Sequence, residues 1–131
     1  MPSSTIEVRR TYSLADEISI VNAVHAAIVD AFQIPSRARN VILTVHQPHR
    51  FPCPPDCEDP DRFTNVNIFA RPGRTLAAKR KLYKGVVDRL ELLGIPGSCV
   101  LIKFHELAAE NIAVRGGQAL CDLDLGYPVN V

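Results

Sequence analysis

Two arginines three positions apart are the first candidates for chemistry in this sequence. Arg71 and Arg74 enclose Pro72-Gly73, where an alternating run ends and a helical pattern begins. Guanidinium groups at such a junction can converge on one carboxylate, which each can hold through two parallel hydrogen bonds. The alternative is a pair of exposed loop arginines without a ligand. We expect both to bind the carboxylate of a small-molecule substrate.

A second candidate site is a group of metal-ligand residue types in a proline-rich segment. It comprises His46, His49, Cys53 and Cys57. Zinc sites usually take two ligand pairs from separated segments, and this spacing does not follow that pattern. A metal-binding module is kept as an alternative, whereas the favoured interpretation is a surface loop with incidental thiols and no metal. A Cys53–Cys57 disulfide is sterically conceivable, but an intracellular compartment argues against it.

The composition is that of one ordinary globular domain. The chain has 131 residues, of which 47% are hydrophobic and 22% are charged, close to the averages for folded domains. With 15 basic and 14 acidic residues the net charge is +1, so no strong field attracts nucleic acid or anionic lipid. No apolar run approaches the roughly 18 residues that span a bilayer, and residues 1–12 do not resemble a signal peptide. We expect a cytoplasmic protein without nucleic-acid or membrane partners.

The arginine pair lies in a motif that the sequence contains twice. In each half an extended run, a helical pattern and a second extended run follow one another. The extended runs cover 5–9, 41–45, 66–71 and 99–104. Ser13 and Thr75 are expected to cap the two helices, and Gly94 to end the second one in a left-handed conformation. Because a helix connects the two strands of each copy, those strands should be parallel.

The duplication predicts an α/β fold in a single domain over residues 1–131. We expect a four-stranded sheet with two helices on one face. The first β-α-β unit covers 2–46, an irregular loop 47–63, the second unit 64–106, and a C-terminal turn and strand 107–131, with the strand at 123–129. The other face of the sheet would be bare, and another subunit is its expected cover.

Several motifs together resemble the tautomerase superfamily, in particular its malonate semialdehyde decarboxylase-like and cis-haloacrylate dehalogenase-like branch. The doubled β-α-β unit and Pro2 directly after Met1 carry the resemblance. The shared segments are Ile34-Pro35-Ser36-Arg37, Arg71-Pro72-Gly73-Arg74-Thr75, Glu110-Asn111, Val114-Arg115-Gly116-Gly117-Gln118 and Asp124-Leu125-Gly126-Tyr127. The resemblance implies a homotrimer and a cofactor-independent enzyme.

The resemblance also implies that Met1 is removed and that Pro2 becomes the N-terminal residue. A free Pro2 is a secondary amine, and an ordinary α-amino group titrates near about pH 7.7–8.0. An apolar pocket or nearby arginines would lower the pKa of this amine, so that it could act as a general base near neutral pH. Moving a proton from the carbon beside a carbonyl group to the oxygen is keto–enol tautomerisation. In the dehalogenase-like branch, a pair of arginines that matches Arg71 and Arg74 in spacing holds the substrate acid.

The chain departs from the family where other reactions need further groups. Decarboxylase-like members carry an aspartate where this chain has Ala38. The water-activating acid of the dehalogenases has no match in Ala113-Val114-Arg115, and Ile112 and Phe104 replace an aromatic residue and a tyrosine. The sequence therefore favours plain tautomerisation over decarboxylation, hydration or dehalogenation.

The predicted function is keto–enol tautomerisation of a small 2-keto or enol carboxylic acid. The predicted catalytic residues are Pro2 and Arg74. The predicted substrate-binding residues are Arg71, Arg74, Phe104, Ile112 and Tyr127. The alternatives are decarboxylation, hydration or dehalogenation of a C3 acid with the same proline, and a non-catalytic trimer.

Overall fold

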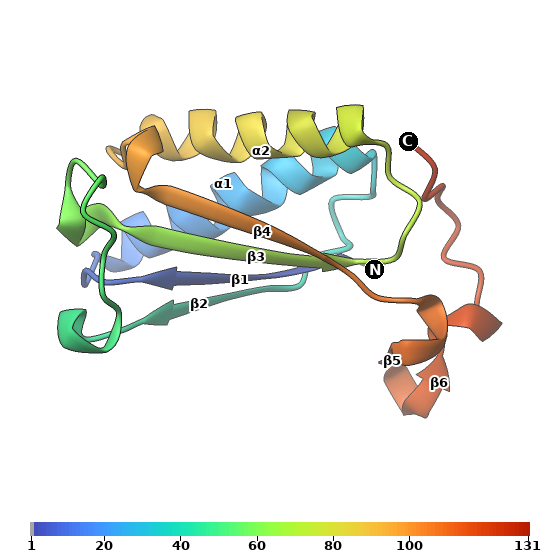
Figure 1. Ribbon diagram of the computed structural model, residues 1–131. Coiled ribbons are helices and arrows are strands. Elements are labelled where there is room, and N and C mark those ends of the chain that lie inside the picture. The colour runs from blue at the N-terminus through green and yellow to red at the C-terminus, as the bar shows by residue number, and fades with distance from the viewer. Residues whose placement is uncertain (1) are drawn as a thin grey trace.

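The fold is a four-stranded sheet covered on one face by two helices (Figure 1). The computed structural model describes residues 2–131. The elements of this unit are β1 (Ser3–Val8), α1 (Leu14–Phe32), β2 (Val41–Val45), β3 (Thr64–Ala70), α2 (Leu76–Glu91) and β4 (Val100–Glu106). Within residues 2–131, neither helix is long and apolar enough to cross a membrane.

The strand pairing matches the predicted duplication. β1 runs parallel to β2, with Ser4 opposite Val41, and β3 runs parallel to β4, with Thr64 opposite Val100. The strand order is β2-β1-β3-β4, so the two units meet through the antiparallel pair of β1 and β3. Both connecting helices lie on the same face of the sheet, as Figure 1 shows. The predicted α/β architecture and the parallel strands are thereby confirmed.

The core lies between the helices and the sheet. Alternate residues of β1 and β3 point into it, and Ile6 and Ile68 are fully buried there. The other face of the sheet carries exposed apolar side chains, with Ile42 of β2 56% exposed and Leu101 of β4 42% exposed. This is the face that a second subunit was expected to cover.

The helix ends follow the capping residues expected from the sequence. Ser13 Oγ accepts a hydrogen bond from the Asp16 amide at 3.1 Å, and Thr75 Oγ1 accepts one from the Ala78 amide at 3.1 Å. Each cap gives a partner to one of the amides that a helix start leaves unpaired. Gly94 follows α2 with φ +87°, the left-handed conformation that glycine adopts without steric cost.

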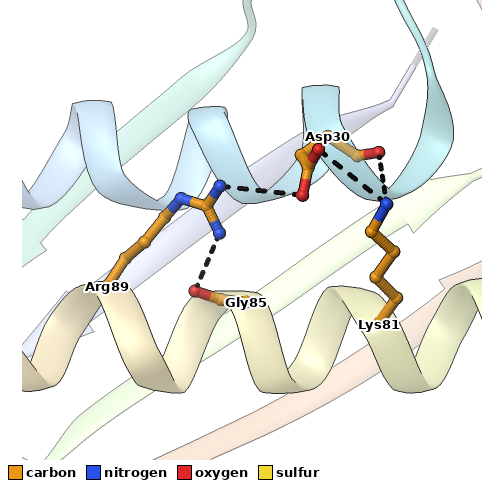
Figure 2. A network of polar contacts seen from close by, with 4 residues as sticks. All are labelled: Asp30, Lys81, Gly85 and Arg89. Carbon is orange, nitrogen blue, oxygen red and sulfur yellow. Dashed lines mark hydrogen bonds and ion pairs between the residues drawn. The ribbon is translucent and has the colours of Figure 1, made fainter.

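The two helices approach each other closely beside a small polar network (Figure 2). The Asp30 carboxylate of α1 lies 3.8 Å from Lys81 Nζ and 3.8 Å from Arg89 Nη2, both on α2. Arg89 Nη1 also donates to the Gly85 carbonyl at 3.3 Å. Because the side chain of Asp30 is about half exposed, these ion pairs add little stability. The close approach depends on Gly85, where a Cβ would lie 3.6 Å from Ala27 Cβ.

We expect Gly85→Ala to stabilise the fold and Gly94→Ala to destabilise it. The methyl group at position 85 makes ordinary contact with Ala27 and displaces only the flexible end of Arg89, while alanine favours the helix by up to about 1 kcal/mol. At Gly94 the left-handed backbone costs alanine roughly 1 kcal/mol or more, although the nearest atom is 3.7 Å away. Urea unfolding measures both changes, and a destabilised Gly85→Ala variant would contradict this description of the helix contact.

The loop at 47–63 packs against the core. It contains two short turns, η1 (Pro48–Arg50) and η2 (Pro60–Arg62). The rings of Phe51 and Phe63 have centres 5.0 Å apart, and Cys57 is only 7% exposed. Most residues of the segment are exposed, as expected for a surface loop. Cys57 and Phe63 nevertheless belong to the core cluster, and Phe51 and Cys53 pack against it.

The C-terminal segment forms a short hairpin and no strand over 123–129. β5 (Ala113–Val114) pairs with β6 (Gln118–Ala119) in an arm that projects from the sheet in Figure 1. The expected strand is absent because Gly126, at φ +76°, turns the chain and its amide donates to Asp124 Oδ1 at 2.8 Å. The last residues return to the start of α2 instead, where the Thr75 amide donates to the Val131 carbonyl at 2.9 Å.

Candidate active site

Pro2 is buried at one end of the sheet. Its neighbour Ser3 pairs with Phe69 of β3, and the Ser4 amide donates to the Asn40 carbonyl at 2.9 Å. Pro2 therefore stands at the sheet end where β3 finishes and where the chain enters β2. The expected removal of Met1 concerns a residue that lies outside the described part of the chain.

Arg71 and Arg74 follow β3 at this same end of the sheet. Arg74 is only 6% exposed. Its guanidinium carbon lies 4.7 Å from the centre of the Phe32 ring, and its Nη1 donates to the Arg71 carbonyl at 3.4 Å. Three other buried nitrogens, namely Nε and Nη2 of Arg74 and Nε of Arg71, have no hydrogen-bond partner among residues 2–131. The arginine pair thus presents buried donors without acceptors.

Tyr127 is electrostatically coupled to both arginines. Burial lowers the pKa of Arg74. The phenolate form of Tyr127 would raise this pKa, whereas the cation of Arg71 lowers it further. Burial likewise raises the pKa of Tyr127, against the opposing cations of Arg71, Arg74 and Arg37. The Tyr127 phenol is therefore protonated at neutral pH, and its buried hydroxyl has no partner among residues 2–131. Two cations and one hydroxyl donor are brought together from distant parts of the chain.

A cavity of about 620 Å³ opens beside Tyr127, between the segment that follows α1 and the C-terminal arm. Its charged and polar lining comprises Arg37, Arg39, Arg115, Gln118, Asp124 and Tyr127. Pro2 and the arginine pair do not line it, so Tyr127 connects the cavity with that pair. Asp124 lines this cavity although no role was expected for it from the sequence. The Asp-x-Gly pattern of residues 124–126 predicts a turn at this position, in which the aspartate side chain accepts a hydrogen bond from the backbone two residues on.

The two remaining predicted site residues lie in different surroundings. Phe104 of β4 packs edge-on against Phe32, with ring centres 5.7 Å apart. The Phe32 ring also contacts the guanidinium group of Arg74. Phe32 therefore lies between Phe104 and Arg74. Ile112 is separate from this group. It lies in the C-terminal arm, where its carbonyl accepts a hydrogen bond from the Leu120 amide at 2.8 Å.

The four candidate metal ligands of the 47–63 region do not converge. His46 Nε2 lies 3.0 Å from Glu7 Oε1, whereas Cys57 donates a hydrogen bond to Cys99. In the part of the chain that the structure describes, no group of three or more His, Cys, Asp or Glu side chains is arranged to hold a metal ion. The alternative of a metal-binding module through these four residues is wrong for this arrangement.

Comparison with known proteins gives a family match and several similar structures. The model of a family described as tautomerase enzyme matches residues 38–115. No curated protein matches the chain. The structure of FG41 malonate semialdehyde decarboxylase inhibited by 3-bromopropiolate has a TM-score of 0.86 and 27% sequence identity, with 96% of this chain and 99% of that chain covered.

Two further solved structures show likeness of fold alone. One is N1, a member of the cis-3-chloroacrylic acid dehalogenase family, with a TM-score of 0.76, 18% identity and coverage of 89% of this chain and 82% of that chain. The other is a fused 4-OT wild-type asymmetric trimer, with a TM-score of 0.80, 16% identity and coverage of 92% and 97%.

Proposed function

Because this chain belongs to the tautomerase enzyme family, we propose that it catalyses keto–enol tautomerisation of a small 2-keto or enol carboxylic acid. Pro2 is the general base and acid once Met1 is removed, and the reaction uses no cofactor. Arg71 and Arg74 hold the substrate carboxylate, with Tyr127 beside them. Phe104 and Ile112 contribute apolar surface at a greater distance from the reacting atoms.

The observation that supports this proposal most strongly is the buried charge of Arg74. A buried cation normally has a counter-ion, because removing a charge from water is costly. Arg74 is stacked on Phe32 instead, and in the described chain its Nε and Nη2 lack acceptors. A substrate carboxylate would supply both the opposite charge and two acceptor oxygens. Arg71 Nε and the Tyr127 hydroxyl offer further donors to the same ligand.

The proposed reaction moves one proton in two steps. Unprotonated Pro2 removes a proton from the carbon beside the keto group, and the electron pair of the broken C–H bond moves toward the carbonyl oxygen. The enolate that forms is stabilised by the guanidinium cations, which are already oriented and buried. Protonated Pro2 then returns the proton to the oxygen. The burial of Pro2 and the nearby cations favour the neutral amine, which is the form that a base requires.

We also propose that the working form is a homo-oligomer, with the homotrimer as the expected assembly. The exposed apolar residues Ile42 and Leu101 lie on the sheet face that the helices leave uncovered. Contact between subunits would remove this apolar surface from water. One of the structures that this chain is similar to is itself a trimer.

Decarboxylation is the second candidate function. It is favoured by the likeness to malonate semialdehyde decarboxylase, which extends over almost the whole of both chains. Asp124 and Ala38 both line the cavity beside Tyr127. Asp124 therefore supplies a carboxylate to the cavity in which Ala38 replaces the aspartate of the decarboxylase-like members. In this reaction protonated Pro2 acts as an acid, since the carbanion left by CO₂ must take up a proton.

One experiment in D₂O separates the two candidate reactions. We expect the protein to exchange the C3 hydrogens of an arylpyruvate such as phenylpyruvate for deuterium, with saturation kinetics, and proton NMR follows the loss of their signal. Malonate semialdehyde is offered in parallel, and its decarboxylation would release acetaldehyde and CO₂. Release of CO₂ without exchange would favour the second candidate. The absence of both reactions would favour the non-catalytic trimer.

A further inference from the structure

Two cysteines that the proposed function does not use lie side by side in the core. Cys57 of the 47–63 loop and Cys99, just before β4, are 42 positions apart in the sequence. Cys57 is 7% exposed and Cys99 is fully buried. The Cys57 thiol donates to Cys99 Sγ, with the two sulfur atoms 2.6 Å apart.

The surroundings of the two thiols hold both sulfur atoms in place. The carbonyl of Asp59 accepts from Cys99 Sγ at 3.2 Å and lies 3.4 Å from Cys57 Sγ. The Asp59 amide donates to Cys99 Sγ at 3.4 Å. One backbone residue therefore fixes both partners, and the pair does not depend on flexible side chains. On the outer side, Cys53 is partly exposed.

Cys57 carries a neutral thiol in this arrangement. Burial, together with hydrogen bonds to Cys99 and to Cys53, raises the pKa of Cys57 to about 12. A metal ion would instead stabilise thiolates, and the described residues supply no further ligand arranged around the pair. The chemistry that this geometry favours for two adjacent buried cysteines is oxidation to a disulfide. From their separation, a closure of about half an ångström reaches the length of a sulfur–sulfur bond.

We propose that Cys57 and Cys99 are a disulfide-forming pair that a low-molecular-weight disulfide such as oxidised glutathione converts to a covalent cross-link. During folding, while the two cysteines are still exposed to solvent, the thiolate of one of them attacks the small disulfide, forms a mixed disulfide and releases one small thiol. The second cysteine attacks the protein sulfur of this intermediate and releases the other small thiol. The protein loses two protons and two electrons in total, and the small disulfide takes them up and becomes two thiols.

The cross-link would tie the proline-rich loop to the edge strand β4. Because it closes a loop of about forty residues, it should restrict the unfolded chain and raise thermal stability. We expect the oxidised protein to melt about 5–10 °C above the reduced protein. The cysteines lie at the far end of β3 and β4 from the arginine pair, so tautomerase activity should change little on oxidation.

The test is refolding of the full chain in glutathione buffers of graded redox ratio. Reduced protein is unfolded in urea, diluted into each buffer, and free thiols are alkylated before digestion with trypsin. We expect a cross-link between the peptide 51–62, which contains Cys53 and Cys57, and the peptide 90–103, which contains Cys99. Excess dithiol should remove it and return the melting temperature to the reduced value.

Single cysteine variants identify the partners. Cys53→Ser is needed because Cys53 and Cys57 lie on the same tryptic peptide. Cys53→Ser and Cys121→Ser should both keep the cross-link, since neither residue belongs to the proposed pair and Cys121 is exposed elsewhere. Cys57→Ser should abolish it. The proposal is overturned if Cys57 and Cys99 remain alkylatable in the most oxidising buffer. It is equally overturned if Cys99 pairs with Cys53 or with another chain, or if the wild-type cross-link leaves the melting temperature unchanged.

Discussion

Pro2→Ala should lower kcat/KM for the keto–enol tautomerisation of an arylpyruvate by about 10²-fold or more. Pro2 is buried where β3 ends and β2 begins, and its ring fixes the nitrogen relative to the backbone of β1. Alanine places a mobile primary amine there, which remains basic but is no longer held in one orientation. Steady-state kinetics across neutral pH measure the loss, which should appear in kcat more than in KM.

The control for this variant is Pro55→Ala, which replaces an exposed proline of the 47–63 loop. It should leave kcat/KM within about twofold of the wild type, because surface changes away from the site have small effects. The intact masses of both variants must show that Met1 has been removed. A Pro2→Ala variant with normal folding, a processed N-terminus and unchanged kcat/KM would contradict the proposed role of Pro2.

Arg74→Met should remove most activity and leave the fold as stable as before or more stable. Two buried donors of Arg74 are assigned to the substrate carboxylate, and loss of such donors typically costs about 10²–10³ in rate. The folded chain holds the Arg74 proton less tightly than the unfolded chain does, since burial lowers this pKa. At neutral pH the charge therefore destabilises the fold, and the apolar methionine would keep the contact with Phe32.

The matched control is Arg80→Met on the exposed side of α2, which should change neither activity nor melting temperature appreciably. Kinetics and thermal unfolding are measured on both variants. If Arg74→Met unfolds several degrees below the wild type, the guanidinium group has a structural role and the substrate assignment fails. Full activity with a normal fold would contradict the assignment more directly.

Much of the fold is predictable because its signals are local. Ser13 and Thr75 precede helical patterns and cap them through their own hydroxyl groups. The parallel strands follow from the helix that connects each pair, since such a connection returns the chain in the same direction. The junction of β3 and α2 likewise brought Arg71 and Arg74 to one end of the sheet, as their spacing suggested.

The surroundings of the site depend on contacts between distant parts of the chain. The C-terminal residues return to the start of α2 through the Val131 carbonyl, and this path places Tyr127 beside the arginines. The alternation at 123–129 indicates a strand only if the left-handed turn at Gly126, closed by Asp124, is left out of account. The contact between Cys57 and Cys99 is also not predictable from the sequence. The two residues are 42 positions apart, in a loop and just before β4, and no periodic pattern relates them.

The most direct test of the central claim is covalent labelling of the native protein by 3-bromopropiolate, a compound that inhibits the decarboxylase this chain is similar to. A neutral Pro2 amine can add to its electron-poor triple bond while the arginine pair binds its carboxylate. We predict one label per chain on the Pro2 nitrogen, loss of activity in parallel with labelling, and protection by an arylpyruvate. Labelling confined to cysteines, or a chain that retains Met1 and still catalyses tautomerisation, would contradict the account.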